Sequence, residues 1–200
     1  MVPTGNSAPR RVRSGPPYAL CCCRPLPVPV KKKICMLGAS AVGKTSLVRR
    51  FVEGIFRDEY VTTIGVQIEK KPVDVEGESV TLILWDVNGE DRFQSVSSSY
   101  IRGAAGYLLV ADGTRPQTLD TAQSLHQRAQ NEVGRVPFYL LVNKVDLRDG
   151  GETDGRNWAV TPEALEQYGL SDWPVLYTSA KDGTHVEQAF AGLAEAFVGT

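Results

Sequence analysis

Apolar runs alternate with amphipathic stretches along the chain from Lys31 onward. Short apolar runs are typical of strands, and apolar residues spaced three and four positions apart are typical of helices that cover a sheet. The predicted strands span 32–37, 66–75, 80–85, 106–111, 138–142 and 174–177. The predicted helices span 44–53, 118–131, 162–168 and 184–197. This alternation predicts an α/β fold with a six-stranded, mostly parallel, doubly wound sheet and helices on both faces.

Two features refine this sheet. The strands 66–75 and 80–85 are joined by Glu76-Gly77-Glu78, which is short enough for a hairpin, so we expect one antiparallel edge strand. The runs 106–111 and 138–142 are entirely apolar and are predicted to be central parallel strands. No run of 18 apolar residues occurs, so the sequence predicts no membrane-spanning helix.

The composition fits one soluble domain with a hydrophobic core, because 42% of the 200 residues are apolar and 22% are charged. Fibrous and wholly disordered chains are excluded. The net charge of −1 hides an asymmetry, since ten of the 22 basic residues precede Glu53, the first acidic residue. Residues 53–200 carry the other 12 basic and all 23 acidic side chains, a net charge of −11.

The first thirty residues differ from the rest of the chain. They hold seven of the 12 prolines and three of the four cysteines, Cys21, Cys22 and Cys23. Proline at this density removes backbone donors and blocks helices, and no apolar periodicity orders the segment. We therefore predict a disordered Pro/Arg/Cys-rich tail over 1–30 and a single domain over 31–200. Three adjacent cysteines cannot cross-link a domain, which favours a reducing, cytoplasmic location.

Three interpretations of the tail stay open. S-acylation of Cys21–Cys23 beside Arg24 would tether this basic segment to an anionic membrane, giving a peripheral membrane association. A tail without function, including upstream sequence from a misplaced start codon, is the plainer interpretation. An Arg-rich beginning without acidic residues also fits an organelle transit peptide. We expect membrane contact only in the first case.

The segment from Gly38 to Thr45 matches the phosphate-loop pattern, and it follows a predicted strand and opens a predicted helix. In such a loop, consecutive backbone N–H groups surround the β-phosphate, Lys44 reaches the β- and γ-phosphates, and the Thr45 hydroxyl binds Mg²⁺. An ordinary glycine-bearing turn is the alternative, which the strand and helix context disfavours. The predicted nucleotide-binding residues here are Gly38, Ser40, Ala41, Val42, Gly43, Lys44, Thr45 and Ser46.

A second motif, Asn143-Lys144-Val145-Asp146, follows the apolar strand that ends at Val142. Ligands bind at the carboxyl edge of open α/β sheets, where this motif lies. The Asp146 carboxylate can accept hydrogen bonds from guanine N1–H and the exocyclic amine, which adenine does not offer at those positions. Leaving a buried carboxylate unpaired is costly, so this motif predicts guanine selection by roughly 10⁴-fold or more. A surface turn is the alternative interpretation.

The order of these motifs resembles that of the Ras superfamily of small GTPases, which are P-loop NTPases. The residues within several of the motifs are most similar to those of the Rab-like branch. The resemblance covers Lys31 to about Val198. It implies that Phe56 packs beside the guanine and that the Thr63 hydroxyl meets Mg²⁺. It also implies that Thr178-Ser179-Ala180-Lys181 is the second base-contacting loop. In this loop Ser179 and Ala180 would offer backbone N–H groups to the guanine carbonyl. The alkyl stems of Lys144 and Lys181 would lie against the base.

The segment Trp85-Asp86-Val87-Asn88-Gly89-Glu90-Asp91-Arg92-Phe93 is similar to the opening of the family's second switch loop. The resemblance implies that Asp86 holds Mg²⁺ through water and that the Gly89 amide meets the γ-phosphate. Loss of that phosphate would release Thr63 and Gly89, so partners that read loops 56–65 and 89–102 would detach. The partners implied are effectors, an exchange factor and an activating protein, with no nucleic acid.

Glu90 stands where the family has a glutamine that positions the attacking water. A carboxylate cannot donate to the γ-phosphate and is repelled by its oxygens, so we expect slow GTP hydrolysis with Lys44, Thr63, Gly89 and Glu90 as the catalytic candidates. A partner's arginine would compensate by about 10³ to 10⁵ in rate, and Arg57 and Arg92 are candidates within the chain. The alternatives are that Glu90 points to solvent, or that the protein binds GTP with little or no hydrolysis.

Two other classes of protein are alternatives to this GTP/GDP switch. An ATP-using phosphotransferase would share the phosphate loop but would not need Asn143 to Asp146, and would carry a lid with several arginines. A nucleotide-insensitive interaction module would have a decayed site, whereas most binding residues are intact here. The chain ends at Phe197-Val198-Gly199-Thr200 without cysteine, so we expect no prenylation at this end, and a prokaryotic Rab-like protein fits as well.

Overall fold

A computed structural model describes residues 30–57, 63–89, 97–148 and 157–198 of the protein. Within these residues one sheet of six strands has the order β2-β3-β1-β4-β5-β6. The strands are β1 (Val30–Gly38), β2 (Val66–Val75), β3 (Glu78–Val87), β4 (Gly106–Asp112), β5 (Phe138–Asn143) and β6 (Val175–Thr178). All neighbouring pairs are parallel except β2 and β3, which form the predicted antiparallel hairpin with Val75 opposite Glu78. The predicted fold class is confirmed.

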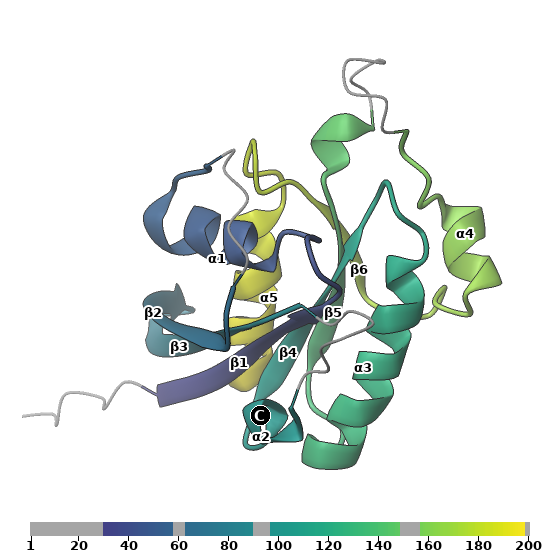
Figure 1. The fold of residues 1–200 in the computed structure, drawn as a ribbon. Helices are drawn as coiled ribbons and strands as arrows, with labels where there is room; N and C mark the ends of the chain where they lie inside the picture. The colour runs from purple at the N-terminus through teal and green to yellow at the C-terminus, as the bar shows by residue number, and fades with distance from the viewer. Residues whose placement is uncertain (1–29, 58–62, 90–96, 149–156, 199–200) are drawn as a thin grey trace, which may run out of the picture.

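Helices cover both faces of the sheet (Figure 1). They are α1 (Lys44–Glu53), α2 (Ser98–Ile101), α3 (Thr118–Val133), α4 (Pro162–Gln167) and α5 (Val186–Val198), with a 3₁₀ turn η1 (Val145–Leu147). Helices α1 and α5 pack on one face, where the rings of Phe51 and Phe190 stack with centroids 4.0 Å apart. Helix α3 covers the opposite face through Leu119 and Leu125. The alternation of strand side chains therefore divides the core into two apolar layers.

Glycines and left-handed residues set several helix boundaries. Helix α1 begins after Gly43, with φ of 98°, and ends at Gly54, with φ of 72°, whose N–H bonds back to the carbonyl of Arg50. Helix α5 begins at Val186, two residues later than predicted, because His185 has a left-handed φ of 50°. The short elements α2 and η1 were not predicted, since four- and three-residue helices carry too little periodicity to detect.

The described residues include no helix that is long and apolar enough to cross a membrane. Cys35 is a free, buried thiol in β1, and burial raises its pKa to about 12, against the lowering effect of Lys33. It is therefore a core side chain with a protonated thiol at neutral pH. The predicted tail lies outside the described residues up to residue 29, and Val30 is the first residue of β1.

Candidate nucleotide-binding site

The phosphate loop joins the carboxyl end of β1 to the first turn of α1. A Cβ on Gly38, whose φ is 154°, would overlap the carbonyl oxygen of Val110 in β4. A Cβ on Gly43 would overlap the side-chain amide nitrogen of Asn143. Glycine is therefore required at both ends of this loop, and the loop is held against the strands that carry the rest of the site.

Lys44 is buried, with 6% of its surface exposed, although it carries an ammonium group. Its Nζ donates to the carbonyl oxygens of Gly38 (3.0 Å) and Ala39 (2.8 Å), so the side chain folds back over the loop. Burial lowers the pKa of Lys44 to about 8, while the nearby Asp86 raises it. A bound phosphate would favour the charged form. The ammonium is therefore placed where negative charge on a ligand would be stabilised.

Thr45, Thr63 and Asp86 form a cluster of oxygen atoms beside the phosphate loop. The Thr45 hydroxyl donates to Oδ2 of Asp86 at 2.6 Å and lies 2.8 Å from the Thr63 hydroxyl. The Oδ1 atom of Asp86 is buried and has no hydrogen-bond partner among the described residues. Burial raises the pKa of Asp86, against the hydrogen bond from Thr45 and the charge of Lys44. Hard oxygen ligands and an unpaired buried carboxylate oxygen fit Mg²⁺ well.

Gly89 lies directly against the phosphate loop. A Cβ at this position would come within 2.7 Å of the Ser40 nitrogen and 2.8 Å of the Ala39 carbonyl oxygen. No side chain fits between these two backbones, which explains the need for glycine at the start of the second switch loop. Glu90, the next residue and a predicted catalytic candidate, lies outside the described residues.

Asn143, at the end of β5, links the phosphate loop to the predicted base-contacting loops. Its Nδ2 donates to the Val42 carbonyl at 2.9 Å, and its Oδ1 accepts from the Thr178 hydroxyl and the Ala180 N–H, both at 3.3 Å. The Ser179 hydroxyl donates to Oδ1 of Asp146 at 2.6 Å. The two sequence motifs, separated by about a hundred residues, therefore meet at one edge of the sheet.

The remaining predicted site residues are distributed around this centre. Phe56 is half-buried and packs against the apolar layer that contains Phe51 and Phe190. Lys144 has a left-handed φ of 71° and a half-buried side chain, whereas Lys181 is exposed. Ser46 lies in the first turn of α1, and Ala41 is exposed at the tip of the phosphate loop with φ of 60°.

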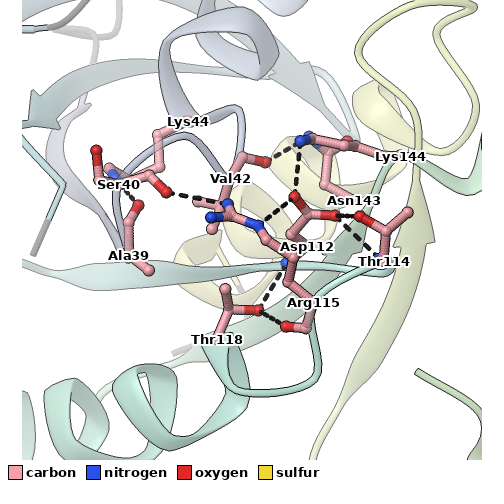
Figure 2. A network of polar contacts seen from close by, with 10 residues as sticks. All are labelled: Ala39, Ser40, Val42, Lys44, Asp112, Thr114, Arg115, Thr118, Asn143 and Lys144. Atoms are coloured by element: carbon pink, nitrogen blue, oxygen red, sulfur yellow. Dashed lines mark hydrogen bonds and ion pairs between the residues drawn. The ribbon is translucent and has the colours of Figure 1, made fainter. Parts of the chain in front are cut away.

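Three charged residues of this region were missed by the sequence reasoning. Asp112 ends β4 and contacts Lys144, and Arg115 follows that strand and contacts both Asp112 and the phosphate loop (Figure 2). Arg50, in α1, donates to the carbonyls of Ala180 (2.8 Å), Lys181 and Gly54 (3.0 Å). For Asp112 a signal existed, because it ends an apolar strand just as Asn143 does. Arg50 and Arg115 bind backbone carbonyls, which leave no trace in the sequence.

A phosphate loop, an oxygen cluster suited to Mg²⁺ and a polar base-contacting edge on one α/β sheet define a P-loop nucleotide-binding protein. Residues 33–198 match the sequence model of the Ras family, and the chain belongs to that family. The predicted membership of the Ras superfamily is thus confirmed. Members of this family are GTP-binding switches with GTPase activity, typically with Mg²⁺.

Curated relatives support the Rab-like branch. The chain is 36% identical over 169 residues to the GTP-binding protein yptV2 of Volvox carteri, with 82% of this chain and 73% of that protein aligned. It is 34% identical over 163 residues to the Ras-related protein Rab-13 of Canis lupus familiaris, covering 81% and 77%. It is 36% identical over 159 residues to the GTP-binding protein ypt1 of Schizosaccharomyces pombe, covering 79% and 75%.

Proposed function

We propose that this protein is a guanine-nucleotide switch that binds GTP and GDP with Mg²⁺, hydrolyses GTP slowly and signals through loops 56–65 and 89–102. The observation that carries the proposal is the position of Asn143, whose side chain bonds both the phosphate loop at Val42 and the base-contacting loop at Ala180. One ligand with phosphates at one end and a base at the other would contact both loops.

Guanine is the base that fits the polar groups at this edge. The Asp146 carboxylate is held in place by the Ser179 hydroxyl and accepts from N1–H and the exocyclic amine in the proposed complex. The Ala180 N–H donates to Asn143 at 3.3 Å and the Ser179 N–H donates to the Thr184 carbonyl at 3.1 Å, so donation to the guanine carbonyl requires that these groups exchange partners when the nucleotide binds. Lys144, Lys181 and Phe56 supply apolar contact to the ring in the proposed complex. Arg50 supports this arrangement because it bonds the carbonyls of Ala180 and Lys181.

A binding experiment with the Mg²⁺-loaded protein tests the nucleotide claim. GTP, GDP and ATP are titrated by calorimetry, and we expect tight binding of both guanine nucleotides and binding of ATP weaker by roughly 10⁴-fold. Equal affinity for ATP would overturn the guanine claim. No binding of any of the three would leave a nucleotide-insensitive interaction module, and a high ATP affinity alone would favour a phosphotransferase.

Slow hydrolysis is the second part of the proposal. Lys44, Thr63 and the Gly89 amide would stabilise charge on the γ-phosphate, and Mg²⁺ held by Thr45, Thr63 and Asp86 would neutralise the phosphate oxygens. Glu90 replaces the water-positioning glutamine of the family. This substitution also favours a second candidate function, a GTP-binding interaction module with little or no hydrolysis.

Single-turnover hydrolysis of GTP by the wild type and by Glu90→Gln separates the two. We expect a slow wild-type rate and a faster rate in the variant, because glutamine can both accept from water and donate to the γ-phosphate. An unchanged rate would remove Glu90 from the mechanism. A wild type with no turnover, even with an added arginine-bearing activating protein, would favour the interaction module.

Partner binding and location complete the proposal. We infer that effectors, an exchange factor and an activating protein bind the two switch loops, because only these loops sense the γ-phosphate. We also infer that residues 31–200 form the nucleotide-binding domain and that residues 1–30 are a tail. Fractionation of cytoplasm and membranes with and without residues 1–30 tests a tether at Cys21–Cys23, and an identical distribution would remove it.

A further inference from the structure

The Asp112 carboxylate, at the carboxyl end of β4, is shared by two cations from different loops (Figure 2). Only 1% of its side chain is exposed. Its Oδ2 atom accepts from Lys144 Nζ at 2.7 Å and from Arg115 Nε at 2.9 Å. Its Oδ1 atom accepts from the Thr114 N–H at 3.0 Å and the Thr114 hydroxyl at 2.8 Å. Every hydrogen-bonding site of this carboxylate is directed at a neighbour that fixes it.

Arg115 continues the connection from Asp112 to the phosphate loop. Its Nη2 donates to the carbonyl oxygen of Ser40 at 3.0 Å, while its Nε stays on Asp112. The rigid fork of the guanidinium suits this bridging, because both bonds come from one plane. The loops after β1, β4 and β5 are thereby joined by three side-chain contacts.

The backbone of Arg115 is itself held in position. The Thr118 hydroxyl donates to the Arg115 carbonyl at 2.7 Å and accepts from the Asp112 N–H at 3.0 Å. Arg115 is 37% exposed and Lys144 24% exposed, yet both end on the same buried oxygen. The side chain of Arg115 is therefore preorganised at the phosphate loop before any ligand arrives.

We propose that Arg115 is a positioning residue that holds the phosphate loop at Ser40 in its binding geometry, anchored on the Asp112 carboxylate that also orients Lys144. This inference rests on the proposed guanine-nucleotide binding. Arg115 acts on the nucleotide through the loop, so its effect is confined to ligands whose β-phosphate uses that loop. Asp112 acts on both ends of the ligand, because it also fixes the lysine proposed to lie against the base.

The charges of Asp112, Lys144 and Arg115 support these two positioning roles. Burial alone would raise the pKa of Asp112, but the hydrogen bonds from Lys144 and Thr114 and the Lys144 charge hold it below its usual value. The group therefore consists of one carboxylate and two cations. Its net positive charge lies beside the loop that is to receive phosphates, and Arg115 lies close enough to Lys44 to oppose protonation of that ammonium.

The test compares the affinities of GTP, GDP and GMP, measured by competition against a fluorescent GDP with Mg²⁺ present. GMP has no β-phosphate and serves as the internal control. We expect Arg115→Gln to weaken GTP and GDP binding roughly tenfold, which is the loss typical of one charged hydrogen bond. GMP binding should weaken less than about twofold. Arg115→Lys keeps the charge without the fork and should retain an intermediate affinity. Asp112→Asn should weaken all three nucleotides.

Arg135→Gln is the matched control, since Arg135 is exposed just before β5, at the edge of the sheet opposite the site. Thermal unfolding of each variant checks that it is folded. If Asp112→Asn does not fold, the Arg115 variants are sufficient for the test. Unchanged GDP affinity in Arg115→Gln, or equal losses for GDP and GMP, would overturn the inference. A wild type that binds none of the three would overturn the proposed function itself, and this inference with it.

Discussion

The surroundings of Asp146 bear on its proposed contact with guanine. Its carboxylate is fixed by a 2.6 Å hydrogen bond from Ser179, which belongs to a loop more than thirty residues further along the chain. The lone pairs left over match the two donors on the edge of guanine. In the proposed complex both oxygens of this carboxylate only accept, so the favoured base is one that presents two adjacent donors.

Replacing Asp146 by asparagine should exchange the preferred base. The amide of asparagine accepts from N1–H but donates where guanine also donates, so we expect GDP to bind at least about 100-fold more weakly. Xanthosine diphosphate carries a carbonyl in place of the amine and should bind better than GDP. Competition titration of the two nucleotides measures this, with Asp172→Asn, an exposed carboxylate before β6, as control. A variant that still prefers GDP would contradict the assignment.

His126 is a buried polar side chain far from the site. Its Nδ1 lies 3.0 Å from the Tyr107 hydroxyl, and its ring packs among Phe138 and Trp173. Burial lowers the pKa of His126 below its ordinary value. The native state therefore disfavours protonation, whereas the unfolded chain takes up a proton near pH 6.5.

This shift predicts that the protein loses stability as the pH falls below about 6.5. In that range the unfolded chain binds more protons than the native state, so the free energy of unfolding decreases with falling pH. Above about pH 7 the contribution is complete. Denaturant unfolding at saturating GDP, at pH 7.5 and pH 5.5, measures the loss, which should be smaller in His126→Gln. His185→Gln, at the only other histidine, should retain it.

Helix α1 connects the two ends of the site. Its first residues would hold the phosphates in the proposed complex, and near its end Arg50 donates to carbonyls of the loop that is proposed to contact the base. Cations near a helix C-terminus are also favoured by the helix dipole. Helix α1 is therefore in direct contact with both loops.

Removal of this arginine should loosen the base-contacting loop. We expect Arg50→Ala to release GDP roughly tenfold faster, because hydrogen bonds to Ala180 and Lys181 are lost. Stopped-flow dissociation of fluorescent GDP measures the rate. Glu53→Ala, an exposed residue of the same helix, is the control. An equal rate in both variants would show that the loop holds its conformation without Arg50.

The segment after β4 shows why packing at a loop can depend on one glycine. The ring of Trp158 covers Gly113, whose carbonyl accepts from the N–H groups of Ala159 and Val160. A methyl group on Gly113 would overlap the Trp158 ring, so Gly113→Ala should destabilise the fold by about 1–3 kcal/mol. Thermal unfolding measures the loss. The double variant Gly113→Ala with Trp158→Leu should recover part of it, and no recovery would place the cost in the backbone.

The regular elements could be predicted from the sequence because their apolar periods are long. Strands such as β4 and β5 and helices such as α3 agree with the predicted ranges within a few residues. Helix α2 could not be predicted, since four residues show no period. The motif residues at Lys44 and Asn143 were predictable because their chemistry is tied to local spacing, whereas Arg50 and Arg115 act on carbonyls that any residue supplies.

At the scale of the whole molecule, the sheet order explains how distant motifs meet. Strand β1 lies between β3 and β4, so the phosphate loop emerges between the strand that carries Asp86 and the strand that ends in Asp112. Strands β5 and β6 bring the base-contacting loops to the same edge (Figure 1). A crevice at the carboxyl ends of strands, where the order reverses, is the expected ligand position in such sheets.

The proposed ligand contacts five loops of one sheet, namely the phosphate loop and the loops that carry Thr63, Gly89, Asp146 and Ala180. Such a ligand should stabilise the entire domain. At a GDP concentration a thousandfold above its Kd, binding adds about 4 kcal/mol to the free energy of unfolding, which raises Tm by roughly 8–16 °C for a domain of this size.

Chelation of Mg²⁺ should remove part of this rise in Tm, because the buried Oδ1 of Asp86 then loses the proposed cation. We expect Asp86→Asn to show a smaller Mg²⁺-dependent part with GDP still bound. Thermal scans with GDP or ATP, each with Mg²⁺ or EDTA, measure these terms, and a rise with GDP that EDTA leaves untouched would argue against a cation at Thr45 and Asp86.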